Sequence, residues 1–279
     1  MSQGIRFILF ATLAFAVMNA MAKELSNFHP LQVVFFRAIG TWIFIFPYML
    51  ANRISIKGTH IRPLLARGIL GVVSLAFFFV AVQRIPLGSA ISIRYLGPIF
   101  GAVFAYFYLK EKVNWMQWLS FAIAFSGVVL LKGFDIRIDF LSLGLLMISA
   151  IFVGGVFVLI RYLSDKEHYL TIINYFMMPS LVLSLCFIQY WRMPLNYEWF
   201  AVCGIGMTGL IGQIYMTRAF QTEETSVLGP FKYMELIYAI IMGYLIFGES
   251  YELIPMLGII LIMGGMLSNV WAKEKVKTV

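Results

Sequence analysis

Charged residues are scarce in this chain. Only 12% of its 279 residues are Asp, Glu, Lys or Arg, whereas a soluble globular protein contains about 25%. Hydrophobic residues make up 61% of the sequence, and its mean hydropathy is +0.89. A soluble domain of this length has no interior large enough to hide so much apolar surface. The composition therefore excludes an ordinary soluble domain and predicts that lipid is the solvent.

The chain is also poor in the residues that metal sites, disulfides and hydrolases use. Its two cysteines, Cys186 and Cys203, fall in apolar runs, where we expect them to pack as small hydrophobic residues. The three histidines, His29, His60 and His168, fall in predicted loops, and no HExxH, GxSxG or nucleotide-binding motif occurs. We therefore expect no cofactor, no metal and no enzymatic activity. An intramembrane enzyme and an ion channel remain as alternatives, although no repeated filter-like segment is present.

Apolar runs follow one another along the whole chain. A helix needs about 20 apolar residues to cross a hydrocarbon core of about 30 Å, and prolines or charged clusters separate ten such runs. The first run lacks a small-residue cleavage site, so we interpret it as a membrane span rather than a signal peptide. The sequence thus predicts an all-α polytopic membrane protein with ten transmembrane helices. The predicted spans are Ile5–Met21, Leu31–Ala51, Leu64–Gln83, Gly88–Leu109, Asn114–Leu131, Phe140–Arg161, Tyr169–Trp191, Glu198–Phe220, Leu228–Phe247 and Glu252–Trp271.

The two halves of the chain resemble each other when one is shifted by 138 residues, and no gap is needed. The shift places Ala81–Lys112 on Ala219–Ser250, and a basic residue followed by tyrosine recurs inside these two otherwise apolar segments. We therefore predict two five-helix repeats, at residues 1–139 and 140–279. The matched pairs include Ala81 with Ala219, Gln83 with Gln221, Arg94 with Lys232, Tyr95 with Tyr233, Tyr106 with Tyr244 and Glu111 with Glu249.

Lysine and arginine are distributed unevenly between the two predicted sides of the membrane. Thirteen of them, Arg67 included, fall on the side of both termini, and five fall on the other side. Because cytoplasmic loops carry the excess of positive charge, we expect both termini in the cytoplasm and the protein in the cell inner membrane. Five spans per repeat is an odd number, so the second repeat must be inverted relative to the first. Inverted repeats are typical of secondary transporters.

Short motifs accompany this architecture. Phe36-Arg37 lies early in the second span, and a glutamate closes the fourth and ninth spans, Glu111 in LKEKV and Glu249 in FGESY. With its ten spans in two repeats, the chain resembles the drug/metabolite transporter superfamily, EamA type, over nearly its whole length. The resemblance implies a carrier that moves a small metabolite by alternating access, with a cavity lined by the first four helices of each repeat and peripheral fifth and tenth helices. That superfamily transports amino acids, nucleosides, sugar nucleotides, organic acids and drugs, so the resemblance names no substrate.

Ionisable residues at membrane depth are the candidates for chemistry. We identify four of them: Arg37, Arg94, Lys232 and Glu235. Each costs about 2.5–3.5 kcal/mol to insert at the centre of a membrane helix, so residues of this kind are functional by default.

Arg94 and Lys232 are equivalent in the two repeats, and each precedes a tyrosine, Tyr95 or Tyr233. The functional interpretation is a pair that binds an anion, because arginine contacts carboxylate or phosphate in a bidentate manner and lysine supplies a compact charge. The alternative is that both side chains extend to the nearest headgroups and anchor their helices.

A Gly-Pro pair stands beside each of these cations. Gly97-Pro98 follows Arg94, and Gly229-Pro230 precedes Lys232. We expect each pair to weaken its helix, which frees backbone groups and permits bending.

Glu235 follows Lys232 by three residues, so the two can share a helix face, whereas Gly97 occupies the equivalent position in the first repeat. Two interpretations stay open. Glu235 is either a proton-coupling site or a charge partner that neutralises Lys232, and in the second case the argument for an anion weakens. Asn19 and Arg37 are further binding candidates. Interhelical hydrogen bonding is the commoner use of such an amide, and for Arg37 we favour a structural role, bonding helix-end carbonyls or an acid.

These residues predict a secondary active transporter for a small organic anion, coupled to protons or working by exchange. The alternative is a carrier of amino acids, nucleosides or other zwitterionic or neutral metabolites. Expected partners are the small-molecule substrate, the lipid bilayer, and a proton or counter-substrate. No nucleic acid is expected, and a homodimer is compatible with the sequence. The candidate substrate-binding residues are Arg94, Tyr95, Lys232, Tyr233, Glu235, Arg37 and Asn19.

Overall fold

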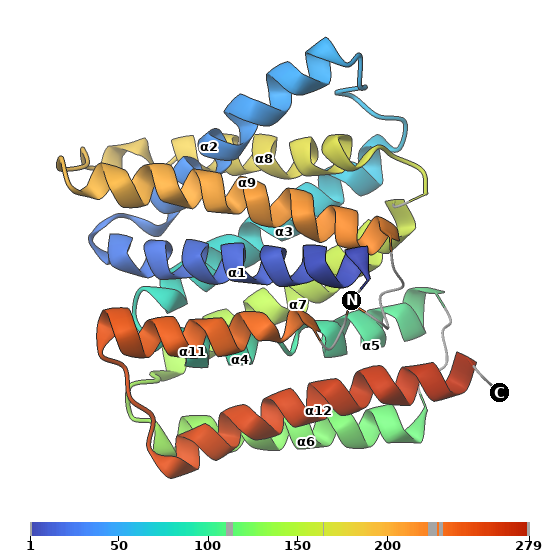
Figure 1. Cartoon of the computed structure of the whole chain (residues 1–279), viewed down its shortest axis with the longest axis vertical. Coiled ribbons are helices and arrows are strands. Elements are labelled where there is room, and N and C mark those ends of the chain that lie inside the picture. The colour runs from blue at the N-terminus through green and yellow to red at the C-terminus, as the bar shows by residue number, and fades with distance from the viewer. Residues whose placement is uncertain (1, 110–113, 164, 223–227, 229–230, 278–279) are drawn as a thin grey trace.

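A computed structural model gives the fold and describes residues 2–109, 114–163, 165–222, 228 and 231–277. These residues form helices joined by turns and short loops, without strands. Figure 1 shows the helices side by side, with both chain termini at the same end of the bundle. We call this the termini end and the opposite one the far end. The helices are α1 (Gln3–Glu24), η1 (Leu25–Asn27), α2 (Pro30–Ala51), α3 (Ile61–Val82), α4 (Leu87–Arg94), α5 (Gly97–Leu109), α6 (Trp115–Phe134), α7 (Phe140–Leu163), α8 (Tyr169–Leu185), η2 (Ile188–Tyr190), α9 (Glu198–Thr222), α11 (Met234–Phe247) and α12 (Leu253–Lys277).

The predicted spans correspond to these helices, which confirms the all-α membrane architecture. Among the described residues, eight helical segments are long and apolar enough to cross a membrane, and two shorter apolar helices, α8 and α11, occupy the remaining predicted spans. Residues that favour a helix N-terminus stand at the start of α1 and α2. The Ser2 hydroxyl accepts the amide of Ile5 at 3.3 Å before α1, and Pro30 opens α2, where an amide donor would find no helical partner.

One predicted span, Tyr169–Trp191, is too long. α8 ends before the last part of this segment, and the chain turns through η2 at the far end. The rings of Phe187 and Tyr190 stack on His29, with ring centres 5.7 and 5.6 Å apart. These contacts hold the segment against the start of α2 instead of letting it continue as helix.

The two cysteines, which we expected to pack as small hydrophobic residues and not as a disulfide, lie on the surface of the helix bundle. Cys186 and Cys203 are both exposed and unpaired. Cys186 follows the last residue of α8, and Cys203 lies on an outward face of α9. An apolar run in a membrane protein faces lipid as well as protein, so composition alone could not separate the two positions.

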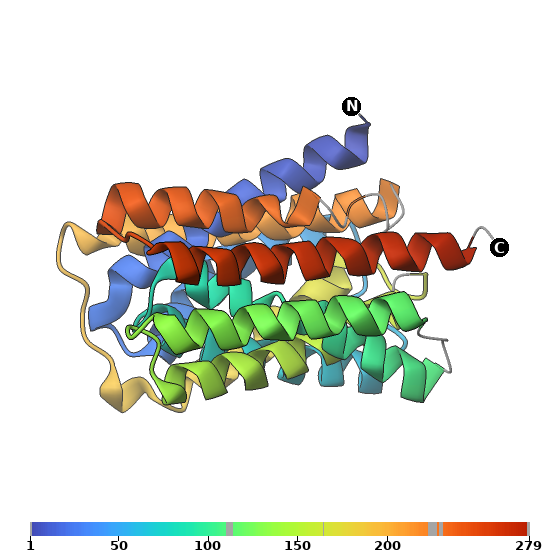
Figure 2. The same cartoon turned by 90° about the horizontal axis from the view of Figure 1, so that it is seen from below.

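The helices pack in pairs that follow the internal repeat. The shift of 138 residues turns α1 into α7 and α3 into α9, and accordingly α1 packs mainly against α9 while α7 packs mainly against α3. α2 lies against both α8 and α9, and α6 pairs with α12. The α6–α12 pair occupies the lower edge of Figure 1 and the front of Figure 2. Helices of one repeat thus pack on helices of the other, and the interior of the protein is the interface between the repeats.

The fourth and ninth spans are interrupted at equivalent positions. α4 and α5 are separated at Tyr95, and α11 begins directly after Tyr233. Pro98 accounts for the first break, because proline has no amide proton and disfavours helical geometry in the residue before it. The second expected weak point, Gly229-Pro230, lies outside the described residues. Interruptions at membrane depth are tolerated where protein or a cavity satisfies the freed backbone groups.

Candidate functional site

A cavity of about 140 Å³ lies between the repeats, next to the two interruptions. Its walls come from α1, α2, α3, α4, α7, α8, α9 and α11 and from residues beside the breaks, and none of the described lining residues belongs to α6 or α12. This arrangement matches the expected peripheral fifth and tenth helices. The polar lining residues are Asn19, Arg37, Arg67, Ser74, Arg94, Tyr95, Gln213, Lys232 and Glu235.

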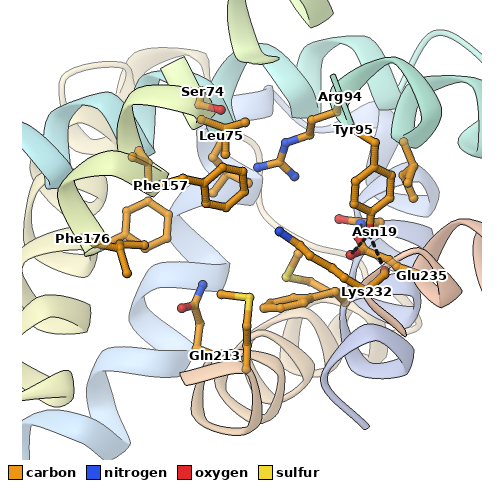
Figure 3. Close-up of a pocket in the computed structure, with 18 of the residues that line it drawn as sticks. Asn19, Ser74, Leu75, Arg94, Tyr95, Phe157, Phe176, Gln213, Lys232 and Glu235 are labelled. Carbon is orange, nitrogen blue, oxygen red and sulfur yellow. Dashed lines mark hydrogen bonds between the residues drawn. The ribbon is translucent and has the colours of Figure 1, made fainter. Parts of the chain in front are cut away.

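Arg94 and Lys232 extend into the same space from the two interrupted spans (Figure 3). The guanidinium carbon of Arg94 lies 4.2 Å from the centre of the Phe78 ring, and Nζ of Lys232 lies 4.2 Å from the centre of the Phe157 ring. Such cation–π contacts contribute about 0.5–2 kcal/mol and use no N–H donor. Nε of Arg94 is buried without a hydrogen-bond partner. Both side chains therefore turn into the cavity, whereas the anchoring alternative requires them to reach headgroups.

A second pair of cations lines the cavity. Arg37 of α2 and Arg67 of α3 lie over the ring of Phe176 in α8, 4.9 and 4.5 Å from its centre. The two arginines are 2% and 4% exposed. Nε of Arg37 donates to Sδ of Met18 at 3.2 Å, a weak acceptor. Nη1 of Arg37 and both Nε and Nη1 of Arg67 have no partner, so this pair also keeps unused donors.

The geometry changes two predictions. We counted Arg67 with the basic residues of the cytoplasmic side and not with the ionisable residues at membrane depth, but it lies inside α3 and lines the cavity. We expected Arg37 to bond helix-end carbonyls or an acid, and among the described residues it bonds neither. A signal for Arg67 was present in the sequence. It lies three residues inside the predicted span, and spacings of four and seven residues place Gly71 and Ser74 on the same helix face.

Glu235 is the carboxylate of this cavity, and two side chains hold it. Nδ2 of Asn19 donates to Oε1 at 3.0 Å, and the hydroxyl oxygen of Tyr95 lies 2.8 Å from Oε2. Figure 3 shows this cluster on one wall, with Phe176 on the opposite wall. Among the described ion pairs there is none between Glu235 and Lys232. The direct neutralisation that we kept as an alternative is therefore not made in this conformation.

The contacts of Tyr95 constrain where protons sit. Its hydroxyl oxygen lies 2.9 Å from the backbone carbonyl of Lys232 as well as 2.8 Å from Glu235. A phenol has one proton, and a carbonyl oxygen can only accept. Both contacts are full hydrogen bonds only when Glu235 carries a proton and donates it to Tyr95.

Other predicted residues take different places. Tyr233 does not line the cavity, and its ring packs edge-on against Tyr95 with centres 5.2 Å apart. Asn174 accepts from Nε1 of Trp42 at 3.2 Å, which is the interhelical bonding expected for a buried amide. Gln213 lines the cavity opposite Tyr95 (Figure 3).

The cavity, the interruptions and the paired repeats agree with a comparison to known families. The model of the EamA-like transporter family matches residues 2–132 and 140–271. The chain belongs to the EamA-like transporter family. It is therefore a multi-pass membrane transporter, which confirms the resemblance inferred from its ten spans and motifs.

Named relatives of this EamA-like transporter match it over most of its length. It is 28% identical over 270 residues to the pseudopaline exporter CntI of Pseudomonas aeruginosa, and the match covers 94% of each chain. It is 26% identical to human solute carrier family 35 member G1, covering 88% of this chain and 73% of the relative. It is 23% identical to the S-adenosylmethionine uptake transporter of Rickettsia prowazekii, covering 98% and 94%.

A solved crystal structure supports the fold. It superposes on this transporter with a TM-score of 0.71 at 17% identity, covering 99% of this chain and all of the other. At this identity the likeness shows that the arrangement of helices is shared, and it carries nothing about the cargo.

At the far end of the transporter, Lys23 and Glu249 form a largely buried ion pair. Nζ of Lys23 lies 2.6 Å from Oε1 of Glu249 and also donates to the carbonyl of Ile85 at 2.6 Å. Oε2 of Glu249 accepts the amide of Leu87 at 2.8 Å, at the start of α4. These contacts join α1, α4 and the end of α11. Glu111, the equivalent of Glu249 in the first repeat, lies outside the described residues.

Proposed function

We propose that this transporter is a secondary carrier of a small organic anion. Four basic side chains, Arg37, Arg67, Arg94 and Lys232, line one cavity together with a single carboxylate. Three of them keep buried donors without partners. Unpaired buried charge is costly, so a cavity of this kind gains most from a ligand of opposite charge. The free donors are the observation that carries the proposal.

Alternating access fits the two interruptions. Tyr95 and Tyr233 lie at equivalent breaks. The run of helical hydrogen bonds is already interrupted there, so the span can bend. In the conformation described here, the ion pair of Lys23 and Glu249 joins α1 to the end of α11 at the far end. Release of cargo at that end requires this pair to separate. We place both termini in the cytoplasm of a cell with the protein in its inner membrane, as the uneven distribution of lysine and arginine favours.

Proton coupling is part of the proposal. Glu235 shares a hydrogen-bond network with Asn19 and Tyr95 inside the cavity that the cations line. Loss of the Glu235 proton would turn a donor toward Tyr95 into an acceptor and would force Tyr95 to release the carbonyl of Lys232. Because Lys232 stands at the second break, this exchange links protonation to the segment that must bend.

The relatives support transport without fixing cargo or direction. One is named as an exporter of pseudopaline and another as an uptake transporter for S-adenosylmethionine. Since these two names give opposite directions, we carry neither direction over to this chain.

A zwitterionic cargo is the second candidate, and Glu235 is the observation that favours it. The carboxylate of Glu235 and several guanidinium groups line the same cavity. An amino acid could place its carboxylate on Arg94 and its amino group on Glu235 with Asn19. Such a cargo would need Glu235 in its ionised form.

Ligand-dependent unfolding of the purified full-length protein in detergent tests the proposal. A ligand at about 100 times its dissociation constant raises stability by roughly 2.7 kcal/mol. We expect monocarboxylates, dicarboxylates and organic phosphates to raise the unfolding midpoint and neutral analogues of the same size to leave it unchanged. Arg94→Gln and Lys232→Gln should lose the response.

The matched control is Arg62→Gln, which removes an exposed arginine of α3. It should respond as the wild type does. Stabilisation by neutral compounds alone, or an unchanged response in Arg94→Gln and Lys232→Gln, would refute the anion carrier. A response to amino acids that Glu235→Gln abolishes would replace it with the zwitterion carrier.

A further inference from the structure

Arg37 and Arg67 form a structural unit separate from Arg94 and Lys232. Both guanidinium groups lie on Phe176, at 4.9 and 4.5 Å from the ring centre. Arg94 and Lys232 instead lie on rings of their own. The repeat that relates Arg94 to Lys232 gives no basic counterpart to Arg37 or Arg67, because the shift of 138 residues places them on Tyr175 and Ile205. The second pair is therefore a feature of its own and not an outcome of the repeat.

The protein leaves space for this pair. A Cβ atom on Gly71 of α3 would lie 3.0 Å from the Phe176 ring and 3.4 Å from Nη1 of Arg67. A Cβ atom on Gly209 of α9 would lie 3.2 Å from Cγ of Arg37. Gly71 and Gly209 are equivalent in the two repeats. Both glycines thus stand where a larger residue would press on the second cation pair or on the ring beneath it.

No acid satisfies the pair. Arg37 and Arg67 take part in none of the ion pairs among the described residues. Phe176 lies across the cavity from Glu235, which Asn19 and Tyr95 already hold (Figure 3). Arginine binds planar anionic groups well, and both of these arginines line the cavity and keep unpaired donors.

The two pairs of cations lie on different rings, Arg37 and Arg67 on Phe176, and Arg94 and Lys232 on Phe78 and Phe157. We propose that Arg37 and Arg67 form a second anion subsite, and that the cargo carries two separate anionic groups, carboxylate or phosphate. One group lies between Arg94 and Lys232, and the other lies on Arg37 and Arg67. This inference rests on the proposed anion carrier and narrows its substrate class.

Paired series of ligands test the subsite. Straight-chain dicarboxylates from malonate to adipate are compared with monocarboxylates of the same chain length, at constant ionic strength so that screening is equal. Affinity is taken from the concentration dependence of the unfolding midpoint of the purified full-length protein. We expect one chain length of dicarboxylate to bind at least tenfold more tightly than its monocarboxylate, because only that length reaches both subsites. A second series of α,ω-bisphosphonates shows whether phosphonate groups serve as well as carboxylates.

Substitutions of single arginines test which residues cause the preference for dicarboxylates over monocarboxylates. Arg67→Gln and Arg37→Gln should bring the dicarboxylate-to-monocarboxylate ratio to within twofold of one, because the dicarboxylate loses much more affinity than the monocarboxylate. Arg62→Gln, on the exposed first turn of the same helix as Arg67, should keep the full preference. Arg67→Lys keeps the charge without the planar fork, so it should give an intermediate ratio if Arg67→Gln fails to fold.

The outcomes separate this inference from the proposed function. If no anion of either series stabilises the wild type, the anion carrier itself is wrong. If monocarboxylates and dicarboxylates bind the wild type equally at every length, the carrier stands and the second subsite is wrong. An equal loss for both series in Arg67→Gln also overturns the subsite, because it shows only a general electrostatic effect.

Discussion

Buried polar groups have hydrogen-bond partners at the interface between α6 and α12, which we call the seam, but several lack partners in the wall of the cavity. At the seam, Nε2 of Gln117 donates to Oδ1 of Asn269 at 3.1 Å, and both residues are buried. In the cavity, three arginines keep N–H groups without partners. Buried polar groups are normally satisfied within a protein. These buried polar groups of the seam are therefore satisfied within the protein, whereas the free donors of the cavity find partners only when a ligand binds.

The backbones of α6 and α12 are also closely packed. A Cβ atom on Gly127 of α6 would lie 2.6 Å from the carbonyl oxygen of Gly258 in α12, and one on Gly258 would lie 2.8 Å from that of Gly127. The two backbones touch, with no side chain between them to readjust. Helices of the cavity walls also touch at glycines, since a Cβ atom on Gly40 of α2 would lie 2.6 Å from Cα of Gly206 in α9. Between those contacts, however, side chains line an open space. We infer that α6 and α12 stay fixed relative to each other, while side chains of the cavity walls rearrange.

The largest expected effect comes from breaking the seam. Gly127→Ala places a methyl group against the backbone of α12, which cannot rotate away. Overpacking usually costs about 1–3 kcal/mol, and we expect about 3 kcal/mol here. The measurement is the thermal unfolding midpoint in detergent. The matched control is Gly133→Ala on the same helix, where a Cβ atom would meet nothing within 4 Å. Equal midpoints for the two variants would show that the seam is loose.

The next effect concerns the tie at the far end. Glu249→Gln removes the negative partner of Lys23, whose pairing leaves the two side chains 15% and 8% exposed. Breaking a fully buried pair costs roughly 3–5 kcal/mol, and we expect about 2 kcal/mol because this pair lies at a helix end. The far end should open more often. A cysteine at Ser89, fully buried in α4, should then react several times faster with an impermeant maleimide.

This labelling needs a background without Cys186 and Cys203, because both are exposed. The control is Arg84→Gln, which breaks an ion pair with Asp139 at the far end. Those side chains are 49% and 45% exposed, so the substitution should cost less than about 1 kcal/mol and leave labelling unchanged. Equal labelling rates for Glu249→Gln and wild type would remove the gating role from Glu249.

The sequence could predict most of the fold because its signals are local. Apolar runs and prolines define the spans, and the shift of 138 residues aligns Arg94 with Lys232 without any structure. Both residues line the cavity. Arg67 escaped prediction because it stands where a predicted span begins, and charge near a span end is normally assigned to the loop.

The network around Glu235 could not be predicted from the sequence. Asn19 lies 216 residues from Glu235 along the chain, and only the packing of the two repeats brings them to 3.0 Å. The same holds for Arg37, Arg67 and Phe176, which meet from three different helices. A single sequence does not show which residues far apart along the chain are in contact. The packing of α1 on α11, and of α2 and α3 on α8, decides them.

Tyr95 and Tyr233 allow a comparison between equivalent residues. The hydroxyl of Tyr95 contacts both Lys232 and Glu235, whereas that of Tyr233 makes no hydrogen bond to any described residue. Tyr95→Phe should cost about 1–2 kcal/mol of stability, because it removes both hydrogen-bond contacts of this hydroxyl from a buried network. Tyr233→Phe should change the unfolding midpoint very little. Equal effects of the two substitutions would show that the ring contact between them matters and the hydroxyl does not.

The smallest effect lies outside the membrane spans, in the loop between α7 and α8. Oε1 of Glu167 accepts the amide of Thr59 at 2.7 Å, its hydroxyl at 2.7 Å and the amide of His60 at 2.5 Å. Burial by itself raises the pKa of Glu167, but the hydrogen bonds from Thr59 and His60 outweigh it and lower this pKa from 4.5 to about 2. The carboxylate of Glu167 thus has its hydrogen-bond partners within the protein, as the polar groups of the seam do and the arginines of the cavity do not.

The shifted pKa predicts how this loop depends on pH. Because the folded-state pKa of Glu167 lies below that of the unfolded chain, its contribution to stability is complete above about pH 4.5 and is lost as the pH falls toward 2. The unfolding midpoint of the wild type should therefore fall between pH 5 and pH 3 by more than that of Glu167→Gln, which has no carboxylate to protonate. If the two midpoints fall in parallel, these hydrogen bonds do not hold the loops together, and the termini end is tied less firmly than the seam.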